Sequence, residues 1–99
     1  MLIIVWQAGG FAGGEPIRIH RVDTSELPEA RRERLERRLA ALKQALEETG
    51  APVGSDLVEY TIEVEADGIR ETFTVADDMD PANPTGLRLR ELLAELSST

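Results

Sequence analysis

The side chains with which this chain could do chemistry do not assemble into a recognisable catalytic set. His20 is the sole histidine and the chain has no cysteine, so the usual zinc ligand sets cannot form. A histidine-activated nucleophile would need His20 beside a serine, and no local pattern supports one. We therefore predict no metal site, no cofactor and no enzyme, and we interpret His20 as a surface or interface residue of a strand.

Acidic residues at 77–80 invite a calcium interpretation, which their spacing does not support. An EF-hand loop counted from Asp78 needs an oxygen ligand at its fifth place, glycine at its sixth and glutamate at its twelfth. Those places hold Ala82, Asn83 and Leu89. The sequence instead predicts a turn before a helix that Asn83 caps.

A glycine-rich run near the start of the chain is the most distinctive local feature. It matches neither a dinucleotide-binding fingerprint nor a Walker A motif, and the pattern that follows it is that of a strand rather than a helix. Its centre is Phe11, a large aromatic residue in a charge-free loop. From the residues alone, Phe11 either folds back onto the core or stands exposed as a contact for a partner.

Two predicted hairpins make up the sheet, and the first of them carries this loop. Residues 2–8 are apolar at nearly every position, which favours a central strand covered at least in part on both faces, and 17–22 form its hairpin partner. Residues 57–66 alternate apolar and polar side chains, and Asp67-Gly68 is a strong two-residue turn signal. The implied register places Ile62 opposite Phe73 and Tyr60 opposite Val75 on one face. On the other face, which the polar residues predict to be solvated, Glu65 lies opposite Arg70.

Each hairpin is followed by a predicted helix with one apolar stripe. The first helix opens near Asp23-Thr24-Ser25, with Pro28 in its first turn, and ends at Gly50; its glutamates and arginines are spaced for ion pairs along the helix. The second starts at Asn83-Pro84. The stripes consist of Leu35, Leu39, Leu42 and Leu46, and of Leu89, Leu92, Leu93 and Leu96. The predicted fold class is α+β with the order ββαββα, a four-stranded antiparallel sheet with both helices packed on one face.

Length and charge bound the remaining possibilities. The 99 residues predict a single domain, 1–99, and a net charge of −8 excludes nucleic acid and anionic membranes as favoured partners. Neither a signal peptide nor a membrane-spanning stretch is evident. Together with the absence of cysteine, these features predict a cytoplasmic protein. The oligomeric state and the order of the strands cannot be deduced from the sequence.

The chain resembles the emfourin family, whose members inhibit protealysin and related thermolysin-like metalloproteases. The resemblance is carried by Gly9-Gly10-Phe11-Ala12-Gly13, then Val22-Asp23-Thr24 and Glu26-Leu27-Pro28. It continues through Tyr60-Thr61-Ile62-Glu63-Val64 and Asp67-Gly68 into the leucine-rich last helix, and so covers nearly the whole chain. Departures are the additional Gly14 and an arginine-rich first helix, which bear on the target protease more than on the fold.

The resemblance implies a competitive, non-covalent inhibitor that occupies the cleft of a thermolysin-like metalloprotease. Phe11 would fill the pocket that receives a bulky apolar side chain just after the scissile bond, and the glycines would let the backbone come close. The zinc would belong to the protease, and Glu15 is the nearest acid after the loop. The predicted partner-binding residues are Gly9, Gly10, Phe11, Ala12, Gly13, Gly14 and Glu15.

Two alternatives come from other functional classes. One is a different protein-interaction domain, in which an exposed edge strand pairs with a partner strand or with a second copy. The other is a small enzyme that uses carboxylates such as Glu15 or Asp77, which the sparse inventory of reactive groups disfavours. The loops at 50–56 and 77–84 are further candidates for partner contact, with nothing in the sequence to choose between them.

Overall fold

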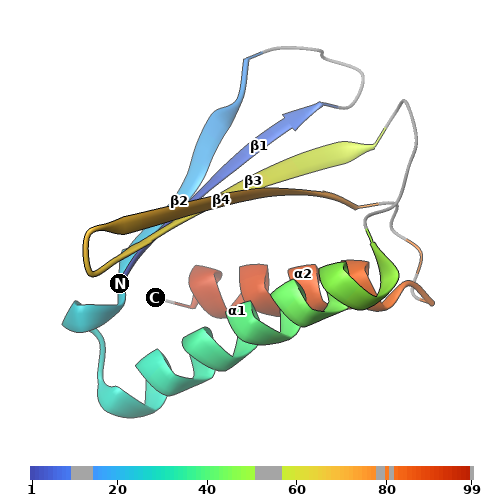
Figure 1. The fold of residues 1–99 in the computed structure, drawn as a ribbon. Coiled ribbons are helices and arrows are strands. Elements are labelled where there is room, and N and C mark those ends of the chain that lie inside the picture. Colours follow the sequence, from blue (N-terminus) through green and yellow to red (C-terminus); the bar gives the residue numbers. More distant parts are fainter. Residues whose placement is uncertain (10–14, 51–56, 78–79, 81, 99) are drawn as a thin grey trace.

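The computed structural model describes residues 1–9, 15–50, 57–77, 80 and 82–98. In this part of the chain, four strands form an antiparallel sheet and two long helices lie across one of its faces (Figure 1). The elements in chain order are β1 Leu2–Gly9, β2 Ile17–Asp23, a short 3-10 helix Thr24–Glu26, α1 Glu29–Thr49, β3 Val58–Ala66, β4 Ile69–Asp77 and α2 Pro84–Ser97. The predicted α+β class and ββαββα order are therefore confirmed.

The sheet order is β2-β1-β3-β4, so β1 and β3 are central and β2 and β4 form the edges. β1 pairs antiparallel with β2 on one side and with β3 on the other. The apolar first strand is thus central, as predicted, but among the described elements the helices cover only one of its faces, so the expected cover on both is wrong (Figure 1). Each hairpin stays intact, and the two hairpins join through their first strands.

The second hairpin has the predicted register along its whole length. Asp67 and Gly68 form its turn with φ angles of 53° and 78°, the positive values that a two-residue turn of this kind requires. On the face away from the helices, the Arg70 guanidinium lies 3.0 Å from the Glu65 carboxylate. The alternating sequence therefore determined both the pairing and the face on which each side chain lies.

One hydrophobic core fills the space between the sheet and the helices. Its strand residues are Ile3, Val5, Ile62, Val64 and Val75, and its helix residues are Leu35, Leu39, Leu42, Leu89, Leu92 and Leu96. Burial of each such side chain contributes about 1.5–3 kcal/mol relative to exposure. Leu46 and Leu93 pack at the margin of this core, partly buried. Both predicted leucine stripes therefore face the sheet.

The first long helix begins later than the sequence indicated. Asp23 accepts hydrogen bonds from the backbone and hydroxyl of Ser25, but it caps only the short 3-10 helix. Leu27 is extended, with φ −94° and ψ 151°, and α1 starts after Pro28. A residue that precedes proline is sterically disfavoured in the helical region. Pro28 therefore precedes α1 rather than lying in its first turn.

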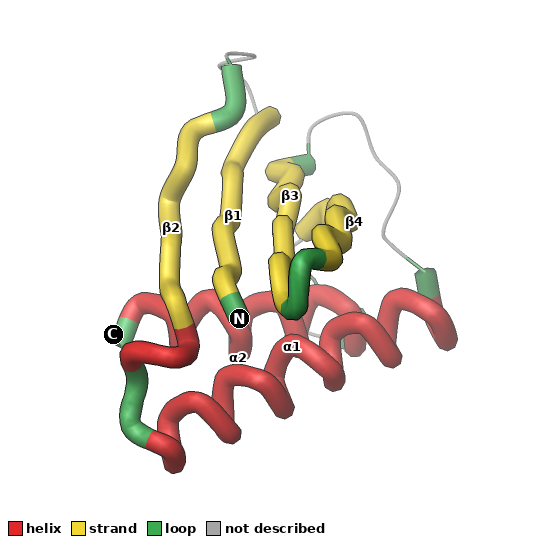
Figure 2. Tube along the Cα trace, turned by 60° about the vertical axis from the view of Figure 1, so that its left-hand side comes forward, coloured by secondary structure: helices red, strands yellow, loops and turns green. Residues whose placement is uncertain are grey.

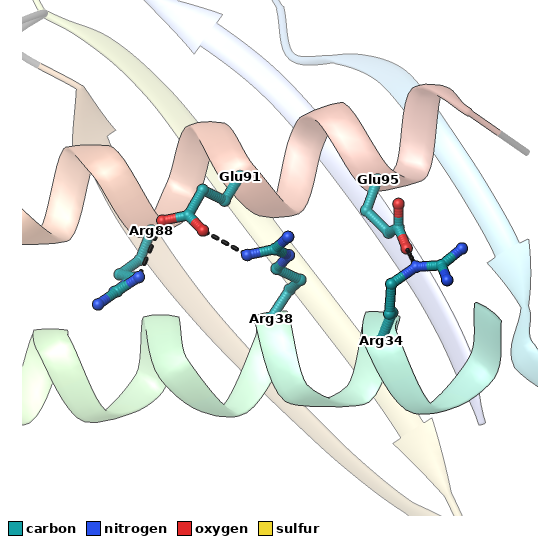
Figure 3. Close-up of polar contacts among 5 residues, drawn as sticks. All are labelled: Arg34, Arg38, Arg88, Glu91 and Glu95. Atoms are coloured by element: carbon teal, nitrogen blue, oxygen red, sulfur yellow. Dashed lines mark hydrogen bonds and ion pairs between the residues drawn. The ribbon is translucent and has the colours of Figure 1, made fainter. Parts of the chain in front are cut away.

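The two helices run antiparallel and are joined by ion pairs on their outer side (Figure 3). Arg34 Nε lies 2.7 Å from Glu95 Oε1, and Arg38 pairs with Glu91, which also accepts from Arg88 at 2.9 Å. The hydrogen bond from Arg34 lowers the pKa of Glu95. The sequence predicts ion pairs along α1. Arg34 and Arg38 instead form ion pairs with glutamates of α2. Because the contacts are largely exposed, each contributes at most about 1 kcal/mol.

The start of α2 caps the end of α1. Asn83 accepts hydrogen bonds from the backbone N–H groups of Thr85 and Gly86, the predicted cap. The fully buried Thr85 hydroxyl donates to the Gly50 carbonyl at 3.0 Å, with the Ala45 carbonyl at 3.4 Å. Carbonyls at the last turn of a helix have no partner within it. Thr85 therefore satisfies part of the C-terminal end of α1 and holds the two helix ends together.

A partly buried ion pair joins α2 to β4. Arg90 Nη1 donates to Asp77 Oδ1 at 2.9 Å, and Asp77 is 5% exposed. A Cβ atom at Gly86 would lie 3.2 Å from each of these two atoms, so Gly86 leaves the space that the pair occupies. Asp77, the carboxylate considered above for catalysis, is thus engaged in holding the second half of the chain together.

Replacing Asp77 by alanine is expected to lower the free energy of unfolding by about 3 kcal/mol, because it leaves the partly buried Arg90 without its partner. Urea denaturation followed by circular dichroism measures this change. The matched control is Glu71→Ala, which removes the exposed ion pair of Glu71 with Lys43 and should cost less than about 1 kcal/mol. Equal effects of the two substitutions would contradict the structural role of Asp77.

Candidate functional site

The predicted partner-binding segment lies at the turn of the first hairpin. Of its seven residues, the structure describes Gly9 at the end of β1 and Glu15 just before β2. Gly10, Phe11, Ala12, Gly13 and Gly14 lie outside the described residues, so the environment of Phe11 stays a prediction. The geometry of the site is therefore built from the two strand ends that hold the segment.

Gly9 has a structural reason to be glycine. Its φ is 95°, a value that favours glycine, and a Cβ atom there would lie 2.8 Å from the backbone oxygen of Leu57. Gly9 is also paired with Val58, the first residue of β3. The backbone of β1 therefore passes close to the chain entering β3 at the point where the glycine-rich segment begins.

The other side of the hairpin is exposed where it enters β2. Glu15 and Pro16 are exposed, and Ile17 is 68% exposed although it pairs with Gln7 of the central strand. The register shifts between Val5 and Trp6, where β2 has one additional residue, Ile19, between the positions paired with them. In both Figure 1 and Figure 2, this end of β1 and β2 projects away from the helix layer. A partner could therefore approach it without contacting the helices.

The sheet order brings the flanks of three loops to one end of the molecule. Gly9, Val58 and Asp77 form one row across β1, β3 and β4. These residues adjoin the glycine-rich segment and the loops at 50–56 and 77–84. At the same end, Thr85 contacts the carbonyl of Gly50. Sequence reasoning named these loops without relating them, because nothing local to the sequence signals that β1 pairs with β3.

Catalytic and metal-binding alternatives gain no support from the described residues. His20 lies opposite Val5, and partial burial lowers the pKa of its imidazole. Asp80 accepts a hydrogen bond from the Ala82 N–H at 2.9 Å, and the Asn83 N–H donates to the Asp80 carbonyl. This is a turn before a capped helix, as predicted. Within the described ranges, no cluster of three or more His, Cys, Asp or Glu side chains could hold a metal ion.

Comparison with known proteins identifies the family. The model of the Emfourin family matches residues 5–96, nearly the whole chain. The chain belongs to the Emfourin family. The earlier resemblance is thereby confirmed. Membership implies a function of the metalloprotease-inhibitor kind with a protease as partner, and it places the chain in a family of inhibitors rather than of enzymes.

Other comparisons add little to the family assignment. Neither the search of curated proteins nor that of solved structures found a significant match. Among the described helices, none is long and apolar enough to cross a membrane. The Emfourin match is therefore the finding on which functional conclusions depend.

Gly9→Ala is expected to destabilise the chain by about 1–3 kcal/mol, because alanine meets both an unfavourable φ and the Leu57 backbone. Gly68→Ala is the matched control: Gly68 also has a positive φ, but a Cβ atom there has open space around it. Thermal and urea unfolding should rank Gly9→Ala as the more harmful. The reverse ranking would show that the close approach of β1 to Leu57 is not a constraint.

Stability should depend on the charge of His20. Burial lowers the folded pKa of its imidazole below the ordinary 6.5, so the unfolded chain binds the proton more readily. The contribution of neutral His20 is then fully present above about pH 6.5, and it is lost as the pH falls from there through the lower folded pKa. We expect His20→Gln to reduce the loss of unfolding free energy between about pH 7.5 and 5.5. An unchanged pH dependence would contradict this role.

Proposed function

We propose that this Emfourin-family chain is a competitive, non-covalent inhibitor of a thermolysin-like zinc metalloprotease. Residues 9–15 would occupy the active-site cleft, and residues 1–99 would act as one emfourin-like domain. The single observation that carries the proposal is the family match over residues 5–96. The geometry of the strand ends that hold the segment is compatible with it.

Support from the fold comes from the way the segment is held. β1 is hydrogen-bonded on both sides, by β2 and β3, up to the residues that flank the segment. A loop carried on such strands loses less conformational entropy on binding than a free peptide does. Exposed Glu15 and Ile17 extend the accessible surface at this end. A projecting hairpin end of this kind suits insertion into a concave cleft.

Each residue of the segment has a proposed role. Phe11 would enter the apolar pocket that receives the side chain after the scissile bond, and its glycine neighbours would allow close approach of the two backbones. Glu15 would lie nearest to the catalytic zinc, which belongs to the protease. The inhibitor itself then needs no cofactor. The absence of cysteine supports action in the cytoplasm.

Phe11→Ala is expected to weaken inhibition of a purified thermolysin-like protease by about 30-fold, equivalent to about 2 kcal/mol for loss of a central aromatic contact. Inhibition constants are measured with a short peptide substrate at several substrate concentrations. A competitive inhibitor raises the apparent KM without changing kcat. Glu15→Gln tests in the same assay whether the carboxylate contributes.

Ile69→Ala is the matched control. Ile69 is an exposed apolar residue, 71% accessible, at the turn of the second hairpin. That turn lies at the opposite end of the sheet from Gly9, so truncating it should leave inhibition unchanged. Equal effects of Phe11→Ala and Ile69→Ala on inhibition would contradict the placement of the glycine-rich segment in the cleft. Absence of inhibition by the wild type against several such proteases would favour the alternative of another small acidic interaction domain.

A further inference from the structure

The two edge strands of the sheet differ in how well they are protected from pairing with another strand. β2 begins directly after Pro16, which has no N–H to donate, and the additional residue Ile19 interrupts its register with β1. It also carries Arg18 and Arg21. Proline, an interrupted register and charged side chains are devices by which natural proteins keep an edge from pairing. β2 is therefore a protected edge.

β4, at the other edge, is a regular strand of nine residues. It contains no proline, and its register with β3 is continuous along its whole length. Its middle, residues 72–76, carries no charged side chain. Within the described part of the chain, no strand pairs with the outer side of β4. A regular, uncharged edge of this kind is a template for a further strand.

The turn before β4 determines which of its backbone groups face outward. Across the two-residue turn at Asp67 and Gly68, the N–H of Ile69 is directed to β3, and this direction recurs at every second residue of an antiparallel pair. The backbone groups directed to the outer edge are therefore those of residues 70, 72, 74 and 76. Their side chains lie on the face away from the helices, because Phe73 and Val75 pack toward the core.

An apolar hollow lies beside this edge, between β4 and α1. Its lining residues are Lys43, Leu46 and Glu47 of α1 with Glu71 and Phe73 of β4, and its volume is about 180 Å³. Leu46 and Phe73 pack against the core but are only partly buried, and the aliphatic stem of Lys43 adds apolar surface. Since an apolar cavity of about 150 Å³ can hold benzene, the hollow has room for one large apolar side chain.

The position of α1 indicates what kind of strand can pair here. Lys43 of α1 forms an ion pair with Glu71, and Figure 2 shows α1 passing below β4. If two copies paired through β4, their α1 helices would lie beneath strands about 4.8 Å apart, whereas packed helices need about 8–10 Å between their axes. A single extended segment brings no helix with it. The edge therefore suits an extended segment better than a second copy.

The side chains along the edge define the chemistry of that segment. On the helix side of β4, Ile69 is 71% exposed and lies four residues before Phe73 on the same face. Glu71 lies between them, and the hollow holds the carboxylates of Glu47 and Glu71 against the single ammonium of Lys43. A segment with apolar side chains four residues apart and a basic side chain midway matches these three positions of β4.

We propose that the outer edge of β4 binds an extended, antiparallel segment of a partner protein. Apolar, basic and apolar side chains at alternate positions of the segment face Phe73, Glu71 and Ile69 in turn. The backbone ladder supplies affinity, and the hollow at Phe73 supplies specificity. Because β4 and β2 are opposite edges of the sheet, this site is separate from residues 9–15 and does not depend on the inhibitor function.

A labelled peptide with this pattern, fluorescein-Lys-Leu-Thr-Lys-Thr-Leu-Lys-amide, tests the proposal by fluorescence anisotropy. We expect saturable binding with a Kd of the order of 100 μM. Thr72→Pro removes an outward N–H without removing a ladder bond to β3, and it should weaken binding by about 10-fold or more. Thr72→Ala keeps this N–H and is the matched control, so its binding should equal that of the wild type.

Modified peptides test the same contact without altering the protein. N-methylation of both threonines removes the N–H groups that face β4 in an antiparallel pair and should abolish binding. N-methylation of the central lysine affects the other edge of the peptide and should leave binding unchanged. Replacing both leucines by alanine should weaken binding by about 10-fold or more, because apolar contact is lost at the hollow and at Ile69.

Amide hydrogen exchange locates the bound peptide. The amides of Arg70, Thr72 and Thr74 should exchange rapidly in the free protein and become protected in the complex, whereas those of Glu71 and Phe73 should be protected in both. Absence of saturable binding up to about 1 mM, or equal binding by the two N-methylated peptides, would overturn the proposal. Equal binding by Thr72→Pro and Thr72→Ala would do so too. Protection of the outward amides in the free protein that disappears on dilution would show pairing of two copies instead.

Discussion

Burial of two leucine stripes against one face of a four-stranded sheet is the interaction on which the rest of the structure depends. The stripes of α1 and α2 and the inward side chains of β1 and β3 share one core. A sheet covered on one side must place its apolar residues on alternate positions. β3 obeys this pattern, but β1 does not: Ile4 and Trp6 on its outer face are as apolar as Ile3 and Val5 on its inner face. That departure leaves apolar side chains of the central strand only partly buried.

Exposed and buried polar interactions add unequally to the stability that this core provides. The ion pairs of Arg34 and Arg38 with α2 are exposed, so they orient the helices at little energetic benefit. The buried contacts of Thr85 and Asp77 act differently, because an unpaired buried group costs far more than an exposed one. They lie where α1 ends and α2 begins, at the same end of the sheet as Gly9. The core thus holds the layers together, and these two contacts hold the end from which the loops emerge.

Membership of the Emfourin family and the position of the hairpin end together indicate where a protease would approach the molecule. In both views, the ends of β1 and β2 that hold the glycine-rich segment project away from the helix layer (Figure 1, Figure 2). A protease bound at this end would therefore not contact the helices.

Much of the fold could be predicted from the sequence, because the signals are local. Asp67-Gly68 determined a turn, the alternation in β3 determined the register with β4, and the leucine spacing determined which helix faces are buried. Leu27 shows the limit of such reasoning: the cap at Asp23 was recognised, but the restriction that Pro28 imposes on its predecessor moved the start of α1. The glycine-rich segment was found by composition and by family resemblance, and its central residues lie outside the described part of the chain.

Only the tertiary structure decided how these local units meet. The pairing of β1 with β3 joins residues some sixty positions apart, such as Ile4 and Glu63, and long-range pairing leaves no periodic signal in either segment. That pairing brought Gly9 beside Leu57 and gathered the flanks of three loops at one end. Likewise, Thr85 could be recognised as an early helix residue but not as the partner of the Gly50 carbonyl. The sequence by itself determined the elements and their buried faces, whereas the packing of one hairpin against the other determined the surfaces available for binding.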